Sequence, residues 1–218
     1  MPSILALIFD HDGTLVDSER SHWQSWNKTL AAYGTEITET QYKAHCAGRS
    51  TLDTARYIKN NLLPDLTTKG LYDIQRQARD ADPGHAHDLL PCADEMVRDL
   101  AKSYPIAIAT GAERYSIDQT LQAYSWGHLF SAIATSSDVA NPKPAPDVYL
   151  KAAEGLGVDA KNCLAIEDSE PGYRSAMAAG CHTILVESDF SPQAWAPADT
   201  PRIANLCELK NYLESVNY

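Results

Sequence analysis

The sequence predicts an α/β fold, a Rossmann-like doubly wound parallel sheet that carries an all-helical domain inserted after its first strand. Three observations lead to this prediction. Short apolar runs of strand length alternate with helical segments from residue 86 onward. Residues 18–82 show helical signals and no strand signal, and a separate apolar run, residues 4–9, comes before them. The helical stretch therefore interrupts a sheet whose first strand has already been formed.

The first apolar run, residues 4–9, has the character of a strand buried on both faces, as in a parallel sheet. It continues directly into Asp10, His11 and Asp12, followed by a Gly-Thr turn. Two carboxylates about 4 Å apart repel each other by roughly 4 kcal/mol at a protein-like effective dielectric. A Mg²⁺ ion, which prefers oxygen ligands, would reverse the sign of that interaction. Taken alone, the stretch is better explained as an ordinary Asp-Gly turn.

Four helices are expected in the insert, and turn residues mark their ends. Asp17 or Ser18 can cap the first helix, which runs to residue 33 and stops at Gly34. Positions 22, 26, 30 and 33 recur at helical spacing and share one face of it. The other three helices cover residues 39–44, 51–62 and 68–81, and prolines follow the last two.

The chain after residue 86 alternates helices and strands. Strands are expected at residues 105–110, 132–135, 163–167 and 182–186, helices at 93–103, 113–124, 146–154, 172–179 and 206–216, and a loop at 188–201. The prediction is thus a core domain of residues 1–15 and 86–218 and a helical domain of residues 16–85. In such a sheet, ligands bind at the carboxyl ends of the strands.

The composition excludes some classes of partner. A formal net charge of −11 argues against a protein that binds the phosphate backbone of nucleic acid, which needs a basic surface. It leaves room for a phosphorylated small molecule, because a local cationic pocket outweighs a distant field at physiological salt. No apolar run approaches membrane-spanning length. We expect no membrane partner, and a monomer or weak dimer.

The five cysteines indicate a reducing compartment. They are widely spaced, odd in number and without a Cys-x-x-Cys pair: Cys46, Cys92, Cys163, Cys181 and Cys207. This pattern is typical of reduced, mostly buried thiols rather than of a disulfide or zinc framework. With no basic region before Ile4, we expect a soluble cytoplasmic protein.

Three more polar clusters follow predicted strands. Thr110-Gly111 ends the second strand, where a hydroxyl and the amides of a helix start can bind an anion, although a plain glycine loop explains the pair equally well. Lys143 lies among prolines at positions 142, 144 and 146, which leave its loop little entropy to lose. Glu167-Asp168 follows a buried strand, so this acidic pair fits a metal site better than a solvated helix start.

The four clusters resemble, in order, the motifs of the haloacid dehalogenase (HAD) superfamily of aspartate-nucleophile phosphohydrolases. The segments are Phe-Asp-His-Asp-Gly-Thr (9–14), Thr-Gly (110–111), Lys-Pro-Ala-Pro-Asp-Val-Tyr (143–149) and Glu-Asp-Ser-Glu-Pro-Gly (167–172). The first is most similar to the β-phosphoglucomutase-like branch. The sequence departs from the family pattern at Pro142, where glycine is usual, and at Ala112, where serine is common. The resemblance covers roughly residues 4–210 and implies a helical cap over the active site.

The resemblance assigns a metal and a nucleophile. Asp10 would attack phosphorus, form an aspartyl-phosphate and ligate Mg²⁺. Asp12 would give its backbone carbonyl to the metal and act through its carboxyl as general acid, then as general base for water. Asp168 would be a direct metal ligand, with Glu167 beside it either as a ligand or as its support. His11 would alternate away from the site in a structural role.

The same resemblance implies that Thr110, Gly111 and Lys143 bind the phosphoryl group. The expected enzyme is a Mg²⁺-dependent phosphatase for a small phosphorylated metabolite such as a sugar phosphate, with His22 and Arg49 as cap residues that contact the substrate.

A phosphosugar mutase of the β-phosphoglucomutase type is the alternative. His22 and Trp26 match the mutase pattern. Arg49, however, follows Gly48 directly rather than three residues later, and a lysine expected near residues 75–76 is missing. A receiver-like module, or a relative that binds a phospho-ligand without turnover, is the alternative from another class.

Overall fold

The computed structural model describes residues 4–47, 49, 51–81, 87–190 and 193–216. The chain divides into two compact units. The first, the sheet unit, comprises Met1–Asp17, Ala86–Ser188 and Pro192–Tyr218, and the second, the helical unit, comprises Ser18–His85 and Asp189–Ser191. The sequence prediction had placed residues 189–191 in a loop of the core.

Among the described residues, the sheet unit contains six parallel strands in the order β3-β2-β1-β4-β5-β6, which confirms the predicted doubly wound parallel sheet. Their bounds are β1 (Ala6–Phe9), β2 (Ile106–Ala109), β3 (Phe130–Ala134), β4 (Cys163–Glu167), β5 (His182–Val186) and β6 (Arg202–Ile203). The chain moves outward from β1 to β3 and then returns to the other side of β1 with β4. The carboxyl ends of β1 and β4 therefore flank the point where the strand order reverses, the usual ligand position in such sheets.

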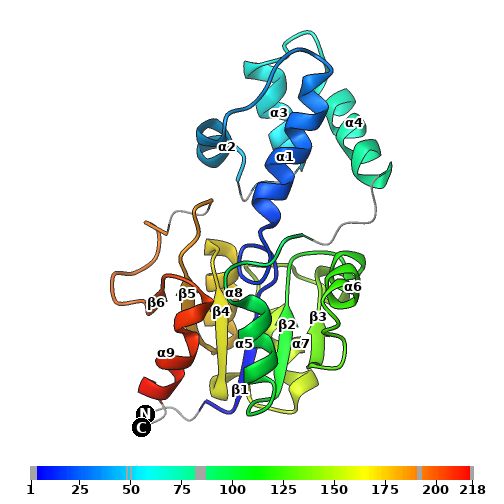
Figure 1. Ribbon diagram of the computed structural model, residues 1–218. Helices are drawn as coiled ribbons and strands as arrows, with labels where there is room; N and C mark the ends of the chain where they lie inside the picture. The colour runs from blue at the N-terminus through cyan, green and yellow to red at the C-terminus, as the bar shows by residue number, and fades with distance from the viewer. Residues whose placement is uncertain (1–3, 48, 50, 82–86, 191–192, 217–218) are drawn as a thin grey trace. The chain divides into compact units, whose positions relative to one another are not determined.

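Helices cover both faces of this sheet (Figure 1). On one face α5 (Ala93–Leu100), α6 (Arg114–Ala123) and α9 (Leu209–Val216) pack against large apolar side chains such as Leu7 and Phe9. On the other face α7 (Asp147–Leu156) and α8 (Glu170–Ala179) pack against small ones. Short 3₁₀ helices, η1 (Ser136–Asp138), η2 (Ala160–Asn162) and η3 (Leu206–Glu208), complete the unit.

The small-residue face lets α7 approach the sheet closely. It is lined by Ala107, Ala109, Ala134 and Ala165, which alternate with the larger residues of the opposite face. A Cβ atom at Gly155 of α7 would lie 2.7 Å from the Cβ of Ala132. Close packing here brings the start of α7, and the lysine loop before it, near the strand ends.

The helical unit has a core of its own. It consists of α1 (Ser18–Ala31), α2 (Glu39–His45), α3 (Thr51–Asn61) and α4 (Thr68–Ala81), around buried side chains that include Trp26, Leu30 and Ile58. Gln75 of α4 joins this core to α1, since its amide accepts from Thr29 Oγ1 (2.7 Å) and donates to Ser25 Oγ (2.8 Å). None of the helices described here is both long and apolar enough to cross a membrane.

Phe190 ties the segment after β5 to the helical unit. Its ring lies under two cations, Lys43 Nζ at 4.7 Å and Arg20 Cζ at 5.4 Å, and meets the ring of Tyr42 edge-on at 6.2 Å. Cation–π contacts of this kind are each worth about 0.5–2 kcal/mol. These contacts explain why the short segment groups with the helices.

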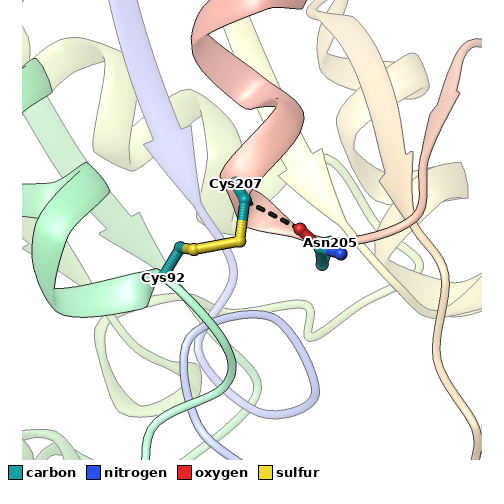
Figure 2. Close-up of a disulfide and its surroundings, with 3 residues drawn as sticks. All are labelled: Cys92, Asn205 and Cys207. Carbon is teal, nitrogen blue, oxygen red and sulfur yellow. Dashed lines mark hydrogen bonds between the residues drawn. A yellow bond between two sulfur atoms is a disulfide. The ribbon is translucent and has the colours of Figure 1, made fainter.

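The expectation that all five cysteines are reduced is wrong. Cys92 and Cys207 form a disulfide, with a Cα–Cα distance of 5.2 Å, between the N-cap of α5 and η3 (Figure 2). The two residues are 115 positions apart, and only the packing of η3 and α9 beside α5 brings them together. Wide spacing in the sequence therefore gave no evidence against a bond. The other three, Cys46, Cys163 and Cys181, are free and buried as expected.

Other differences concern element ends. Strand β6 was missed because two residues after a proline carry no periodic signal, yet they pair with Leu185 and Val186. The helix expected at 93–103 ends at Leu100, and the one expected at 206–216 begins as η3.

Candidate active site

The two aspartates of the first motif follow β1 directly. The N–H of Asp10 donates to Ile166 O of β4 (2.9 Å), which extends the pairing of the two strands by one residue. Asp10 is buried and Asp12 is partly exposed. His11, between them, is fully buried and points toward α6, where its Nε2 lies 3.0 Å from Thr120 Oγ1.

Gly13 brings the first motif against the fourth. Its φ of +81° is a conformation that residues with a side chain rarely adopt. A Cβ atom at this position would lie 2.3 Å from Oδ2 of Asp168. The loop after Asp12 can therefore pass beside the Asp168 carboxylate only because glycine stands there.

Lys143 connects the lysine loop to both acidic strand ends. Its Nζ donates to Asp10 Oδ1 and to Glu167 Oε1, both at 2.6 Å, and its side chain is 10% exposed. Burial disfavours the charged ammonium, but Asp10 and Glu167 outweigh that effect and raise the pKa of Lys143. The side chain is thus a fixed positive charge between two carboxylates.

Glu167 is fully buried and held on both oxygens. Oε1 accepts from Lys143 and from the Tyr149 hydroxyl (2.7 Å). Oε2 accepts from the backbone N–H groups of Asp168 (3.2 Å) and Ser169 (3.3 Å) and from Ser169 Oγ (3.0 Å). The first turn of α8 lies directly against this carboxylate, because a Cβ atom on Gly172 would come within 1.8 Å of Oε1. A carboxylate at a helix N-terminus is favoured by the helix dipole.

Asp10, Glu167 and Asp168 form a buried acidic cluster in which each residue offers one oxygen within 4.8 Å of the others. Burial, together with the charges of Glu167 and Asp12, raises the pKa of Asp10 to about 7, although Lys143 opposes the rise. Burial and the charges of Asp10 and Glu167 also raise the pKa of Asp168 well above its usual range. One lysine does not balance the charge of this cluster, so the cluster suits a divalent cation.

Thr110 and Gly111 follow β2, the neighbour of β1. Thr110 is fully buried and its Oγ1 accepts from Ala112 N (3.0 Å), which leaves its own O–H to donate. Gly111 is exposed, and a Cβ atom there would meet nothing within 4 Å.

The two candidate cap residues belong to the helical unit. His22 is an exposed residue of α1, and Arg49 is an exposed residue after α2 whose N–H donates to Cys46 O (3.0 Å). The core and cap candidates thus lie in different units, and the structure brings together Asp10, Lys143, Glu167 and Asp168 of the sheet unit.

The sequence analysis gave no role to Tyr149, Ser169 and Gly172. All three act on Glu167, as donors or by leaving room for it. A signal was present, because each of the three belongs to a quoted motif. What the motifs could not tell is that their polar atoms converge on one carboxylate.

Comparison with known proteins agrees with this geometry. Residues 7–186 match the family described as haloacid dehalogenase-like hydrolase. Protein CbbY of Rhodobacter capsulatus is 36% identical over 89% of this chain and 92% of its own length. Fructose-1-phosphate phosphatase YqaB of Escherichia coli is 31% identical over 83% of this chain and 95% of its own.

A solved structure shares the fold at the scale of the whole chain. The HAD family hydrolase of Deinococcus radiodurans, which has bound phosphate and sodium, superposes with a TM-score of 0.82 at 26% identity, over 98% of this chain and 96% of that one. Fold, site and relatives agree: the chain belongs to the haloacid dehalogenase-like hydrolases, and it is a phosphatase of that family, an enzyme that hydrolyses phosphoric monoesters.

Proposed function

We propose that the protein is a Mg²⁺-dependent phosphatase that removes the phosphoryl group of a small metabolite through an aspartyl-phosphate on Asp10. The single observation that carries this proposal is the contact of Lys143 with Asp10 and Glu167 beside Asp168, four motif residues in one buried cluster. A buried carboxylate with a fixed cation on one oxygen is oriented for attack.

The chemistry of the donor set supports Mg²⁺. The cluster offers carboxylate oxygens, the hard ligands that this ion prefers. Asp10 and Asp168 would hold it, together with the backbone carbonyl of Asp12. Because Glu167 already accepts five hydrogen bonds, we assign it to holding Lys143 and the start of α8 rather than to direct coordination. The ion would supply charge neutralisation to the transferring phosphoryl group.

The remaining steps use the chain's own residues. A carboxylate oxygen of Asp10 attacks phosphorus while the bond from phosphorus to the leaving oxygen breaks, and Asp12 donates a proton to that oxygen. Asp12 then takes a proton from water, whose oxygen attacks the same phosphorus. The Asp10–phosphorus bond breaks, and inorganic phosphate and the Asp10 carboxylate are formed. Lys143, the Thr110 hydroxyl and the Gly111 N–H would hold the phosphoryl oxygens.

One relative supports a sugar phosphate as the substrate class. The name of fructose-1-phosphate phosphatase YqaB states its substrate, and the match covers 95% of that protein. The mutase alternative rests on Trp26 and His22, but Trp26 is buried in the core of the helical unit, where packing explains a tryptophan. The mutase pattern expects a lysine near Gln75. The Gln75 side chain instead forms hydrogen bonds with Thr29 and Ser25 of α1.

A phosphate-release assay tests the proposal. A panel of phosphorylated metabolites, with sugar phosphates among them, should release inorganic phosphate in Mg²⁺ and not in EDTA. Asp10→Asn should lose turnover by at least 10³-fold, on the order expected for removal of a nucleophile. Asp118→Asn is the matched control, because Asp118 is an exposed residue of α6 that accepts from Arg114, outside the cluster. Turnover by Asp10→Asn near the wild-type rate would overturn the covalent mechanism.

Product analysis separates the phosphatase from the mutase. A mutase must pass its phosphoryl group to a sugar hydroxyl faster than to water. Incubation with β-glucose 1-phosphate and a trace of the bisphosphate should therefore give stoichiometric phosphate and no glucose 6-phosphate. Efficient isomerisation would replace the phosphatase proposal with the mutase.

We also propose that residues 16–85 serve as a cap that selects the substrate, with His22 and Arg49 as contacts. Remote binding energy spent on cap closure helps only substrates large enough to reach the cap. His22→Ala and Arg49→Ala should then impair hydrolysis of the true substrate and leave p-nitrophenyl phosphate hydrolysis nearly unchanged. Equal losses on both substrates would contradict a cap contact.

Finally, we propose that the protein is cytoplasmic and is a monomer or weak dimer. Gel filtration with light scattering measures the oligomeric state, and fractionation of the source cells identifies the compartment.

A further inference from the structure

Gln193 joins the ends of two neighbouring strands. It follows the segment that leaves β5, and its side-chain Nε2 donates to the backbone oxygens of Val186 (2.6 Å) and Asp168 (3.2 Å). Val186 is the last residue of β5, and Asp168 is the first residue after β4. One amide group thereby bridges the two strands just past their last paired residues, Glu167 and Leu185.

The orientation of this amide follows from chemistry. Two carbonyl oxygens require a donor, so the NH₂ group must face them and Oε1 must point away. Oε1 is buried and has no hydrogen-bond partner in the part of the chain that is described. A buried acceptor without a partner costs about 1–3 kcal/mol. An apolar residue would avoid that cost but would also remove the donor shared by the oxygens of Val186 and Asp168, so the role of Gln193 lies in these two bonds.

The peptide that Gln193 holds belongs to the acidic cluster. The carbonyl of Asp168 and the N–H of Ser169 are parts of one peptide unit. Gln193 holds the carbonyl end, and Glu167 Oε2 accepts from the N–H end at 3.3 Å. The plane of this peptide, and with it the direction in which Asp168 leaves the backbone, is therefore fixed from both sides.

We propose that Gln193 is a positioning residue for the metal site. By holding the Asp168–Ser169 peptide, it keeps the Asp168 carboxylate in place beside Asp10. This inference rests on the proposed Mg²⁺-dependent function. Hydrogen bonds that orient metal ligands commonly change metal affinity by 10- to 100-fold when they are lost. Gln193 acts on Asp168 only through the backbone. We therefore expect its loss to weaken Mg²⁺ binding by roughly 10-fold, the lower end of that range.

The chain offers a matched control in the same segment. Arg202 donates to the carbonyl oxygens of Thr200 (3.0 Å) and Pro197 (3.2 Å), but to no group of the acidic cluster among the hydrogen bonds described for it. Arg202→Leu loosens the segment that contains Gln193 without removing a donor from Asp168.

The experiment measures Mg²⁺ binding by titration calorimetry, which needs no turnover. Wild type, Gln193→Leu, Gln193→Asn and Arg202→Leu are compared, and their melting temperatures are recorded. Gln193→Leu removes both donors and also the partnerless oxygen. Gln193→Asn keeps the amide but is one methylene too short, and it serves as the mildest change should the leucine variant not fold.

The expected result is a Mg²⁺ dissociation constant about 10-fold higher in both Gln193 variants and unchanged in Arg202→Leu. At saturating Mg²⁺ the KM for substrate should stay at the wild-type value in all of them. Wild-type affinity in the Gln193 variants, or an equal loss in Arg202→Leu, overturns the positioning role and leaves the proposed function standing. Failure of the wild type to bind Mg²⁺ overturns both.

Discussion

Asp10 faces conflicting demands, because burial favours its neutral form and catalysis requires the ionised one. Its carboxyl is buried beside Glu167 and Asp12, and the ammonium of Lys143 offsets only part of their effect. A divalent cation would supply the missing positive charge. The folded protein without its ligand is therefore less stable than it could be, because these groups are arranged to bind that ligand. Such a loss of stability at an active site is common in enzymes.

This conflict predicts a stabilising substitution. Since the folded protein raises the pKa of Asp10 to about 7, it binds this proton more tightly than the unfolded chain, whose Asp pKa is about 3.9. Metal-free wild type should therefore lose stability as the pH rises from about 4 through about 7. Asparagine does not titrate, so Asp10→Asn should be more stable than wild type at pH 8 in EDTA, by roughly 1–3 kcal/mol.

Urea unfolding at pH 5 and pH 8 measures the difference. The advantage of Asp10→Asn should shrink at pH 5, where wild-type Asp10 is mostly protonated, and should shrink again at pH 8 when Mg²⁺ is added. Parallel pH dependence of the two proteins in EDTA would contradict the raised pKa.

At the scale of residues, the sequence predicted which side chains belong to the site better than it predicted their contacts. Asp10, Lys143, Glu167 and Asp168 could be named because each follows a strand within a motif. Gln193 could not, because it lies in no motif and its donors reach a backbone oxygen 25 positions away. The fixed place of Tyr149 beneath Lys143, at 5.2 Å from Nζ to the ring, likewise depends on how α7 packs.

At the scale of elements, α8 supports the site through its first turn. Ser169 caps the helix by accepting from Gly172 N (3.2 Å) while its hydroxyl donates to Glu167. Gly172 leaves the space in which the Glu167 carboxylate lies. Helix start and carboxylate thus require each other.

Gly172→Ala should therefore damage the site from a position that carries no functional group. The added Cβ would lie 1.8–2.2 Å from the atoms of the Glu167 carboxylate, so the carboxylate or the helix must move. We expect phosphate release to fall by more than about 10-fold, because Lys143 loses its second anchor, and the melting temperature to fall by several degrees, on the order of a 1–3 kcal/mol overpacking cost.

Gly127→Ala is the control for this prediction, since a Cβ atom there would meet nothing within 4 Å and its φ is not positive. It should leave turnover unchanged and stability equal or slightly higher. Full activity in Gly172→Ala would show that Glu167 can be displaced without harm.

Elements with strong local signals could be predicted almost to the residue. Helix α4 and strands β4 and β5 have the predicted bounds, and Gly34 and Gly180 take the positive φ expected after a helix. Strand β6 could not be predicted, because Arg202–Ile203 becomes a strand only through pairing with β5.

At the scale of the whole molecule, contacts between distant segments decide what local patterns cannot. The sheet unit is built from segments on both sides of the helical insert, and their meeting is visible where Leu90 N donates to Leu15 O (3.0 Å) and Val16 bridges to Leu89. The Cys92–Cys207 bond joins the same returning segment to η3 before the last helix (Figure 2). Sequence spacing carries no record of this bond because the fold, not the spacing, sets the distance between its ends.

The disulfide makes a final prediction about the stability of the sheet unit. A cross-link over 115 residues removes loop-closure entropy from the unfolded chain, which corresponds to a stabilisation of up to about 5 kcal/mol, with 2–4 kcal/mol typical of measured cases. Reduction should therefore lower the free energy of unfolding of wild type by roughly 2–5 kcal/mol. Cys207→Ser should show the same loss without reductant.

Chemical unfolding with and without a phosphine reductant measures this loss. The control lies within the variant itself: Cys207→Ser should unfold identically in both conditions, since Cys46, Cys163 and Cys181 are free thiols. Turnover below the transition should be retained in the reduced protein, because Cys92 and Cys207 make none of the hydrogen bonds described for Asp10, Lys143 or Glu167. Equal unfolding free energies for oxidised wild type and Cys207→Ser would mean that α5 and η3 hold together by packing alone.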